Sequence, residues 1–159
     1  MQKITPAART VSHGTFVIER ELPHAPARVF AAWADPKAKA QWFGMPKGAG
    51  REVIRQQDFK VGGKERLRGE WNNGKVSDFH CVYQDIVQDR RIVYCYNMYV
   101  NEEKISVSLA TIEFEPSGKG TKLILTEQGA YVDGGIDGHA SREQGTRGLV
   151  DNLATYLQG

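Results

Sequence analysis

The feature that most constrains the fold is one stripe of apolar residues at helical spacing near the end of the chain. The stripe consists of Thr146, Leu149, Val150, Leu153 and Leu157. Intervals of three and four residues place these side chains on one face of a helix. Just before them, the pattern Ser141-x-x-Gln144 predicts a capping box at the helix start. Such a helix must bury its apolar face against another element.

A meander of β-strands offers the large apolar surface that this helix needs. Alternation of apolar and polar residues predicts strands over 52–59, 64–71, 77–87, 91–99, 105–115 and 121–128. Turn signals such as Gly62-Gly63 and Asn72-Asn73-Gly74 separate the strands. Strands joined by short turns pair antiparallel with their neighbours, so we expect one sheet with the helix lying across it.

A further strand and two short helices precede the meander. Residues 15–22 alternate as a strand, and Pro26 can open a helix because the first helical N–H has no partner. Asp35 is predicted as the N-cap of a second short helix that starts at Pro36 and runs to residue 41 or 42. The polar residues 1–14 are predicted to form a flexible arm. The expected fold class is therefore α+β, with 15–159 as a single domain.

Charge and composition exclude several classes of partner. Among 159 residues, 21 basic and 19 acidic side chains give a formal net charge of +2, so we expect no nucleic-acid partner. No run approaches the ~20 apolar residues of a membrane span, and the first residues lack the apolar core of a secretory signal. We expect a cytoplasmic protein in which Cys81 and Cys95 are free thiols.

Several short segments, taken in order, resemble one known superfamily. They are Ala25-Pro26-x-x-Val29-Phe30, Trp33-x-Asp35-Pro36, Gln41-Trp42-Phe43-Gly44, Phe59-x-x-Gly62-Gly63, Arg91-Ile92-Val93-Tyr94 and Gly120-Thr121-Lys122-Leu123-x-Leu125-Thr126-Glu127. Their order and spacing over residues 15–158 resemble the START-like, birch-pollen-allergen-like helix-grip superfamily (SRPBCC). Within it, the chain looks most similar to the activator of heat-shock protein 90 ATPase homologue branch.

The resemblance implies a curved seven-stranded antiparallel sheet that wraps around the C-terminal helix and leaves a pocket between them. It implies no shared catalytic residue, so function must be inferred from the site itself. Members of the branch usually start the last helix with Gly-Trp, whereas this chain has Gly145-Thr146. The missing indole predicts a larger or wetter cavity. Close approach of helix to sheet or space for a ligand would explain Gly148, and simple local tolerance of glycine accounts for it equally well. The Gly-rich segment 131–140 is expected to form a mobile lip.

The strand alternation sorts residues onto a concave face that would line the pocket. Tyr94, Tyr96 and Met98 share one strand of this face. A change of apolar phase between Leu109 and Ile112 predicts a β-bulge that bends the sheet. The predicted ligand-binding residues are Trp42, Phe43, Leu67, Trp71, Phe79, Tyr83, Tyr94, Tyr96, Met98, Glu127, Tyr131, Thr146 and Leu149. Trp42 and Phe43 could equally pack the core, and some tyrosine hydroxyls could reach water at the rim.

Glu127 is the one candidate catalytic residue. On the concave face its carboxyl group would lose water, so we expect its pKa to rise, which would suit proton transfer. A carboxylate in this position can also stay solvated or pair with an arginine. The four histidines are scattered, so no metal site is predicted, and neither a nucleophile elbow nor a phosphate-binding loop is present. No cofactor is predicted.

Three functions compete at this point. The first is binding of a small hydrophobic or aromatic molecule in an enclosed cavity of several hundred cubic ångströms. The second is a polyketide cyclase-like or hydrolase-like enzyme that uses general acid–base chemistry at Glu127. The third, which the branch name suggests, is a co-factor of a chaperone ATPase. A homodimer stays open as well, because the first strand could lie at a sheet edge and pair with a second copy.

Overall fold

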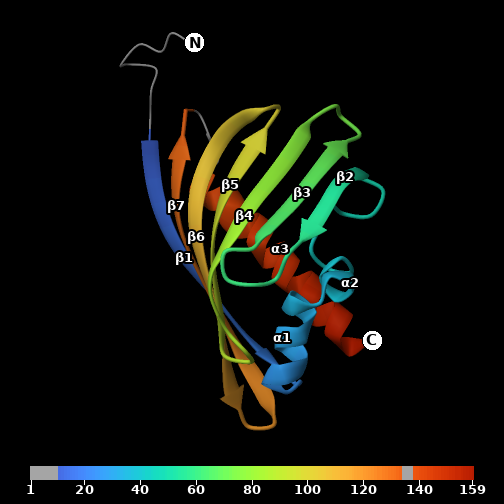
Figure 1. Cartoon of the computed structure of the whole chain (residues 1–159), viewed down its shortest axis with the longest axis vertical. Coiled ribbons are helices and arrows are strands. Elements are labelled where there is room, and N and C mark those ends of the chain that lie inside the picture. The colour runs from blue at the N-terminus through green and yellow to red at the C-terminus, as the bar shows by residue number, and fades with distance from the viewer. Residues whose placement is uncertain (1–10, 134–137) are drawn as a thin grey trace.

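One antiparallel sheet of seven strands curves around a long C-terminal helix (Figure 1). The computed structural model describes residues 11–133 and 138–159. The elements are β1 (Val11–Leu22), α1 (Pro26–Ala34), α2 (Pro36–Lys39), β2 (Gly50–Gln57), β3 (Lys64–Trp71), β4 (Val76–Val87), β5 (Arg91–Val100), β6 (Glu103–Ser117), β7 (Gly120–Val132) and α3 (Gly138–Gln158). The strand order β1-β7-β6-β5-β4-β3-β2 and the helix across one face confirm the predicted α+β helix-grip fold.

The paired strands β1 and β7 are both longer than the sequence predicted. β1 begins at Val11, opposite Val132, and the pairing continues without a shift to Leu22 opposite Thr121. Glycines interrupt the added segments at Gly14 and Gly129, so apolar alternation did not reveal them, whereas the neighbouring strand supplies backbone partners. Residues 1–10 of the expected arm lie outside the described residues.

The two short helices form where their start signals predicted them. The Asp35 carboxylate accepts a hydrogen bond from the backbone N–H of Lys37 at 3.0 Å, which confirms its role as N-cap of α2. α2 ends at Lys39, earlier than predicted. α1 buries Val29, Phe30 and Trp33, so it closes one end of the core below the sheet (Figure 1).

The long helix α3 presents the predicted stripe to the sheet but starts earlier than predicted. Thr146, Val150, Leu153 and Leu157 are buried, whereas Leu149 is half-buried. Because α3 already begins at Gly138, Ser141 lies inside the helix, and the predicted capping box is wrong. Of the expected lip, Tyr131 and Val132 belong to β7, and 134–137 lie outside the described residues.

The predicted bulge between Leu109 and Ile112 is also wrong. β6 pairs with β5 in constant register from Ser106 to Glu113, so the phase of alternation never changes there. The inward positions Ser106, Ser108 and Ala110 carry small side chains, and this hid the alternation from an apolar pattern. The sheet bends elsewhere, with register shifts in the β2–β3, β4–β5 and β5–β6 pairs.

Two sequence expectations concern thiols and membranes. Cys81 and Cys95 are free; Cys81 is buried, whereas Cys95 lies opposite Val82 and is half-buried. None of the helices in the described ranges has the length and apolar character that crossing a membrane requires.

Candidate functional site

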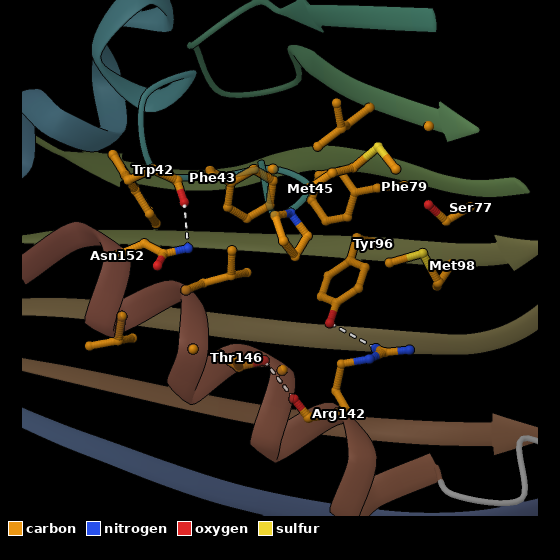
Figure 2. A pocket seen from close by; sticks show the side chains of 18 of the residues that line it. Trp42, Phe43, Met45, Ser77, Phe79, Tyr96, Met98, Arg142, Thr146 and Asn152 are labelled. Carbon is orange, nitrogen blue, oxygen red and sulfur yellow. Dashed lines mark hydrogen bonds between the residues drawn. The ribbon is translucent and has the colours of Figure 1, made fainter. Parts of the chain in front are cut away.

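A deep pocket lies between the first half of α3, the segment 40–47 that follows α2, and the concave face of strands β3 to β5 (Figure 2). Its volume is about 1340 Å³, and it is open on one side rather than enclosed as expected. This volume exceeds the several hundred cubic ångströms of a typical ligand site. The sheet therefore grips the helix along only part of its length.

The pocket brings together twelve of the thirteen residues that the strand faces and the helix stripe singled out. These are Trp42, Phe43, Leu67, Trp71, Phe79, Tyr94, Tyr96, Met98, Glu127, Tyr131, Thr146 and Leu149. Tyr83 is the exception. It is buried behind the wall of the pocket, where its hydroxyl donates to Glu65 and accepts from Gln57.

An aromatic cluster forms the wall opposite α3. The rings of Phe43 and Phe79 lie edge to face with centroids 5.4 Å apart, and Phe79 lies 4.9 Å from Tyr96. Trp42 contacts Phe43 at 5.7 Å. Trp42 and Phe43 are both buried and both line the pocket, so the two interpretations of these residues, core packing and pocket wall, hold together.

Contacts with four other elements, α1, α3, β2 and β3, hold the segment 40–47 in place. The indole N–H of Trp42 donates to the carbonyl of Ala32 at 3.0 Å, and the Trp42 carbonyl accepts from Asn152 on α3 at 3.5 Å (Figure 2). Arg55 on β2 donates to the Phe43 carbonyl at 2.5 Å. Met45 packs on Gly69, where a Cβ atom would lie 2.7 Å from the Met45 sulfur. Sequence reasoning missed Met45 and Asn152, because neither lies in a periodic pattern.

Two of the three glycines of α3, Gly145 and Gly148, face open space. A Cβ atom added at Gly145 or at Gly148 would meet no atom within 4 Å, and both residues line the pocket. Close approach of helix to sheet, one of the explanations for Gly148, is therefore wrong. With Thr146 in place of a larger residue, these positions leave the mouth of the pocket wide.

Arg142 places a guanidinium at the inner end of the pocket, as Figure 2 shows for its contact with Tyr96. Its Nη1 donates to the Tyr96 hydroxyl at 2.8 Å, and its Nη2 donates to Ser106 Oγ at 2.7 Å. A longer bond of 3.4 Å joins Nη1 to Ser108 Oγ. Burial opposes the charge of Arg142, but the neighbouring Tyr96 and Glu127 outweigh it and raise its pKa further, so Arg142 stays a cation.

Glu127 lies beside this cation with its side chain 3% exposed. The Tyr96 hydroxyl donates to Glu127 Oε2 at 2.8 Å, and Arg142 Nη1 lies 3.6 Å from the same oxygen. Burial raises the Glu127 pKa, while Arg142 and the hydrogen bonds from Tyr96, Arg142 and Ser108 oppose that rise without cancelling it. Both sequence interpretations hold here: the carboxyl group is desolvated, and it is also paired with an arginine.

Tyr131 covers Arg142 from β7, with the guanidinium carbon 5.5 Å from its ring centre. Its hydroxyl is buried and has no hydrogen-bond partner among the described residues. Gly129 gives this hydroxyl room, because a Cβ atom there would lie 3.0 Å from the Tyr131 oxygen. A buried hydroxyl without a hydrogen-bond partner is uncommon in folded proteins.

Sequence reasoning missed Arg142, although a signal was present. Arg142 lies four residues before Thr146, so it extends the buried stripe by one helical turn. The Thr146 hydroxyl donates to the Arg142 carbonyl at 2.9 Å, which links the two positions. In the sequence, a charged residue at a stripe position indicates the end of the apolar face. In the structure, the small inward residues of β6 make room for the Arg142 side chain.

Within 11–133 and 138–159, no group of three or more histidine, cysteine, aspartate or glutamate side chains is arranged to hold a metal ion. Four polar groups of the pocket lie close together: Arg142, Glu127, Tyr96 and Tyr131.

Comparisons with known proteins agree with the fold of the chain. A model of the family described as "Activator of Hsp90 ATPase homolog 1-like protein" matches residues 23–158. None of the curated proteins compared with the chain matches it.

Solved structures of similar proteins cover almost the whole chain. A protein from Rhizobium leguminosarum is 41% identical, with a TM-score of 0.89 over 94% of this chain and 97% of its own. A protein from Rhizobium loti is 44% identical, with a TM-score of 0.83 over 92% of this chain and 99% of its own. A protein from Chromobacterium violaceum, 22% identical, shares the fold with a TM-score of 0.74 over 91% of this chain and 97% of its own.

Proposed function

The chain belongs to the family of Activator of Hsp90 ATPase homolog 1-like proteins, and from its pocket we propose that it binds a small, partly apolar molecule. The observation that carries the proposal is the room of about 1340 Å³ between α3 and the aromatic wall. Apolar walls with a few polar groups at one end are the usual composition of a small-molecule site.

The packing of the helix supports the proposal. A helix held only to complete a core would bring its apolar stripe into contact along its whole length. Here the inward side chains of the second half, Leu153 and Leu157, are fully buried, whereas the first half carries Gly145 and Gly148 and leaves space. A ligand in that space would contact Phe43 and Phe79 on one side and α3 on the other.

The first test looks for a bound molecule and for stabilisation. We expect native mass spectrometry of the purified protein to detect a co-purified small molecule. We also expect a thermal-shift screen of fatty acids, sterols, flavonoids and polyketides to raise the melting temperature, because a ligand at about 100 times its Kd stabilises by about 2.7 kcal/mol. The proposal fails if neither experiment finds a ligand.

A matched pair of variants places the ligand in this pocket. Gly148→Phe projects a ring into the open space beside α3, and Gly148→Ala changes the same backbone position without filling the space. We expect Gly148→Phe to abolish the thermal shift and Gly148→Ala to retain it. Equal binding by the two variants would place the ligand elsewhere.

Catalysis is the second candidate, and Glu127 is the observation in its favour. Its carboxyl group lines the pocket, has a raised pKa and shares a hydrogen bond with Tyr96, as a general acid or base requires. Once a ligand is known, Glu127→Gln should abolish turnover and retain binding. Turnover that survives this substitution would remove the cyclase or hydrolase alternative at this residue.

The family description names an activator of the Hsp90 ATPase, and this supports a chaperone co-factor as a further alternative. The direct measurement is the ATPase rate of the chaperone with and without this protein. Stimulation that persists in Gly148→Phe would assign the activity to the surface rather than to the pocket.

A further inference from the structure

The guanidinium of Arg142 makes its short hydrogen bonds with neutral hydroxyls, whereas its carboxylate partner, Glu127, lies farther away at 3.6 Å. Its hydrogen bonds go to the hydroxyls of Tyr96, Ser106 and Ser108. The Glu127 carboxylate, at 3.6 Å, is its nearest acidic partner but makes no direct hydrogen bond of normal length with it. A buried arginine normally forms short, paired hydrogen bonds with a carboxylate. In this protein, no carboxylate among the described residues forms such short, paired hydrogen bonds with Arg142.

The inner end of the pocket also holds a donor without an acceptor. The Tyr131 hydroxyl has no hydrogen-bond partner among residues 11–133 and 138–159. Arg142 and Tyr131 both line the pocket, and the guanidinium lies over the Tyr131 ring. The site therefore offers one cation and one hydroxyl donor to a group that only accepts.

We propose that the ligands of this pocket are anions, each with an apolar ring or chain and one carboxylate or similar oxyanion that binds Arg142 and the hydroxyl of Tyr131. This inference rests on the binding function proposed above and names its substrate class. The apolar part of the ligand would lie between α3 and the aromatic wall of Phe43 and Phe79.

A single negative charge fits the site better than two. Arg142 is the only cation among the described residues at the inner end of the pocket, and the nearby Glu127 carboxylate already offsets part of its positive charge. The lining lysines, Lys47 and Lys75, lie in exposed turns at the mouth. A phosphate dianion would need a second cation close by to offset its desolvation. A ligand cation would meet the like charge of Arg142.

Binding of an anion would also favour protonation of Glu127. The groups that face Glu127 are Arg142 from α3, Tyr96 and Tyr94 from β5, Ser108 from β6 and Tyr131 from β7, and Arg142 is the one cation among them. A second carboxylate beside Arg142 would favour the protonated form of Glu127. The complex would thus take up a proton, and affinity for the anion would rise as the pH falls.

Matched acid and amide probes test the charge preference directly. The probes are 2-naphthoate with 2-naphthamide and octanoate with octanamide, titrated into the full protein by calorimetry. We expect each acid to bind about tenfold to a hundredfold more tightly than its amide, as a charge-assisted hydrogen bond supplies. We expect proton uptake for the acids only, measured in two buffers of different ionisation enthalpy, and affinity for the acids alone should fall as the pH rises through the raised pKa of Glu127.

Variants then assign the preference to Arg142. Arg142→Met should remove the preference for acid and leave amide affinity unchanged, whereas Ser106→Ala, which removes a hydroxyl partner but keeps the cation, should retain it. Tyr131→Phe should weaken binding of the acids severalfold without loss of stability. If Arg142→Met does not fold, the acid-to-amide ratio and the proton uptake of the unaltered protein decide.

The outcomes separate the two proposals. Equal affinity for acid and amide overturns the assignment of anionic ligands and leaves the binding function standing. Failure of all four probes, together with an empty thermal-shift screen, overturns the binding function itself. A preference for acid that survives in a folded Arg142→Met variant overturns the role of Arg142.

Discussion

Lys39 on α2 and Glu65 on β3 form an ion pair inside the core, with Nζ 2.7 Å from Oε1 and side chains only 2% and 3% exposed. The ammonium also lies 4.3 Å from the centre of the Phe43 ring, and the hydroxyl of Tyr83 donates to the same Glu65 oxygen. The pair thus joins α2, and the segment that forms one wall of the pocket, to the sheet. The aromatic wall separates it from the ligand space.

We predict that Lys39→Met destabilises the protein by about 3–5 kcal/mol, because it leaves the Glu65 carboxylate buried without a cation. Urea unfolding measures the change. The double variant Lys39→Met with Glu65→Leu should recover most of the loss, and Lys37→Met, at an exposed position of the same helix, should be nearly neutral. A double variant as unstable as the single one would contradict the assignment of the loss to an unpaired charge.

The outer face of the sheet supplies a prediction on acid stability. Asp78 on β4 is 6% exposed and bonds Arg66 at 2.9 Å, Arg68 at 2.8 Å and His80 at 3.0 Å. Burial by itself raises the Asp78 pKa, but these three partners outweigh it and lower the pKa to about 2. Because the folded pKa lies below the unfolded value of 3.8, the stabilisation is complete above about pH 4 and is lost as the pH falls toward 2.

We therefore predict that Asp78→Asn costs about 1–2 kcal/mol at neutral pH, a value that allows for solvent screening of the partly exposed arginines. The difference from the unaltered protein should disappear near pH 2. Asp85→Asn, which removes an exposed partner of Arg91, serves as the control and should change stability by less than about 0.5 kcal/mol. A pH-independent loss in Asp78→Asn would contradict the assignment.

Glu127 should show the opposite dependence on pH. Its folded pKa is raised by burial above the ordinary value of 4.5, so the folded state holds the proton more tightly than the unfolded state. Stability from this group is present below pH 4.5 and falls as the pH rises through the folded pKa, by about 1.4 kcal/mol for each unit of the rise in pKa. The stability of Glu127→Gln relative to the unaltered protein should thus increase with pH. Denaturant unfolding at several pH values measures this, and a constant difference would show that Glu127 does not titrate in this range.

Two glycines should respond to alanine in opposite directions. Gly145 lies in α3 with no atom within 4 Å of an added Cβ, so Gly145→Ala should stabilise by about 1 kcal/mol through helix propensity. At Gly50 the Cβ would lie 2.1 Å from the backbone oxygen of Glu70, which cannot move without breaking the β2–β3 pairing. Gly50→Ala should destabilise by about 1–3 kcal/mol or more. Thermal unfolding compares the two variants, and equal effects would contradict the close approach of β2 to β3 at Gly50.

Alternation along the strands predicted much of the candidate site. Tyr94, Tyr96 and Met98 follow one another at a period of two, so their common face was readable before any contact was known. Thr146 and Leu149 were readable from helical spacing in the same way. Tyr83 also fits the alternation along its strand, but it lies outside the pocket because α2 and Lys39 cover that part of the concave face.

Errors arose where small or polar residues occupy inward positions. Ser106, Ser108 and Ala110 hid the phase of β6 and suggested a bulge that does not exist. The same residues create the space that Arg142 fills, so the loss of the apolar signal and the presence of the cation have one cause. Neither could be inferred from one strand or one helix alone.

By itself, the sequence determined the order of the elements, the antiparallel meander, the buried face of the last helix and the family resemblance, because these depend on local periodicity, caps and turns. Only the tertiary structure decided which polar groups meet. The contacts among Arg142, Tyr96 and Glu127 join α3, β5 and β7, and the paired residues lie 15 to 46 positions apart in the chain. Such contacts depend on the volume left between packed elements, and no short-range pattern in a sequence encodes that volume.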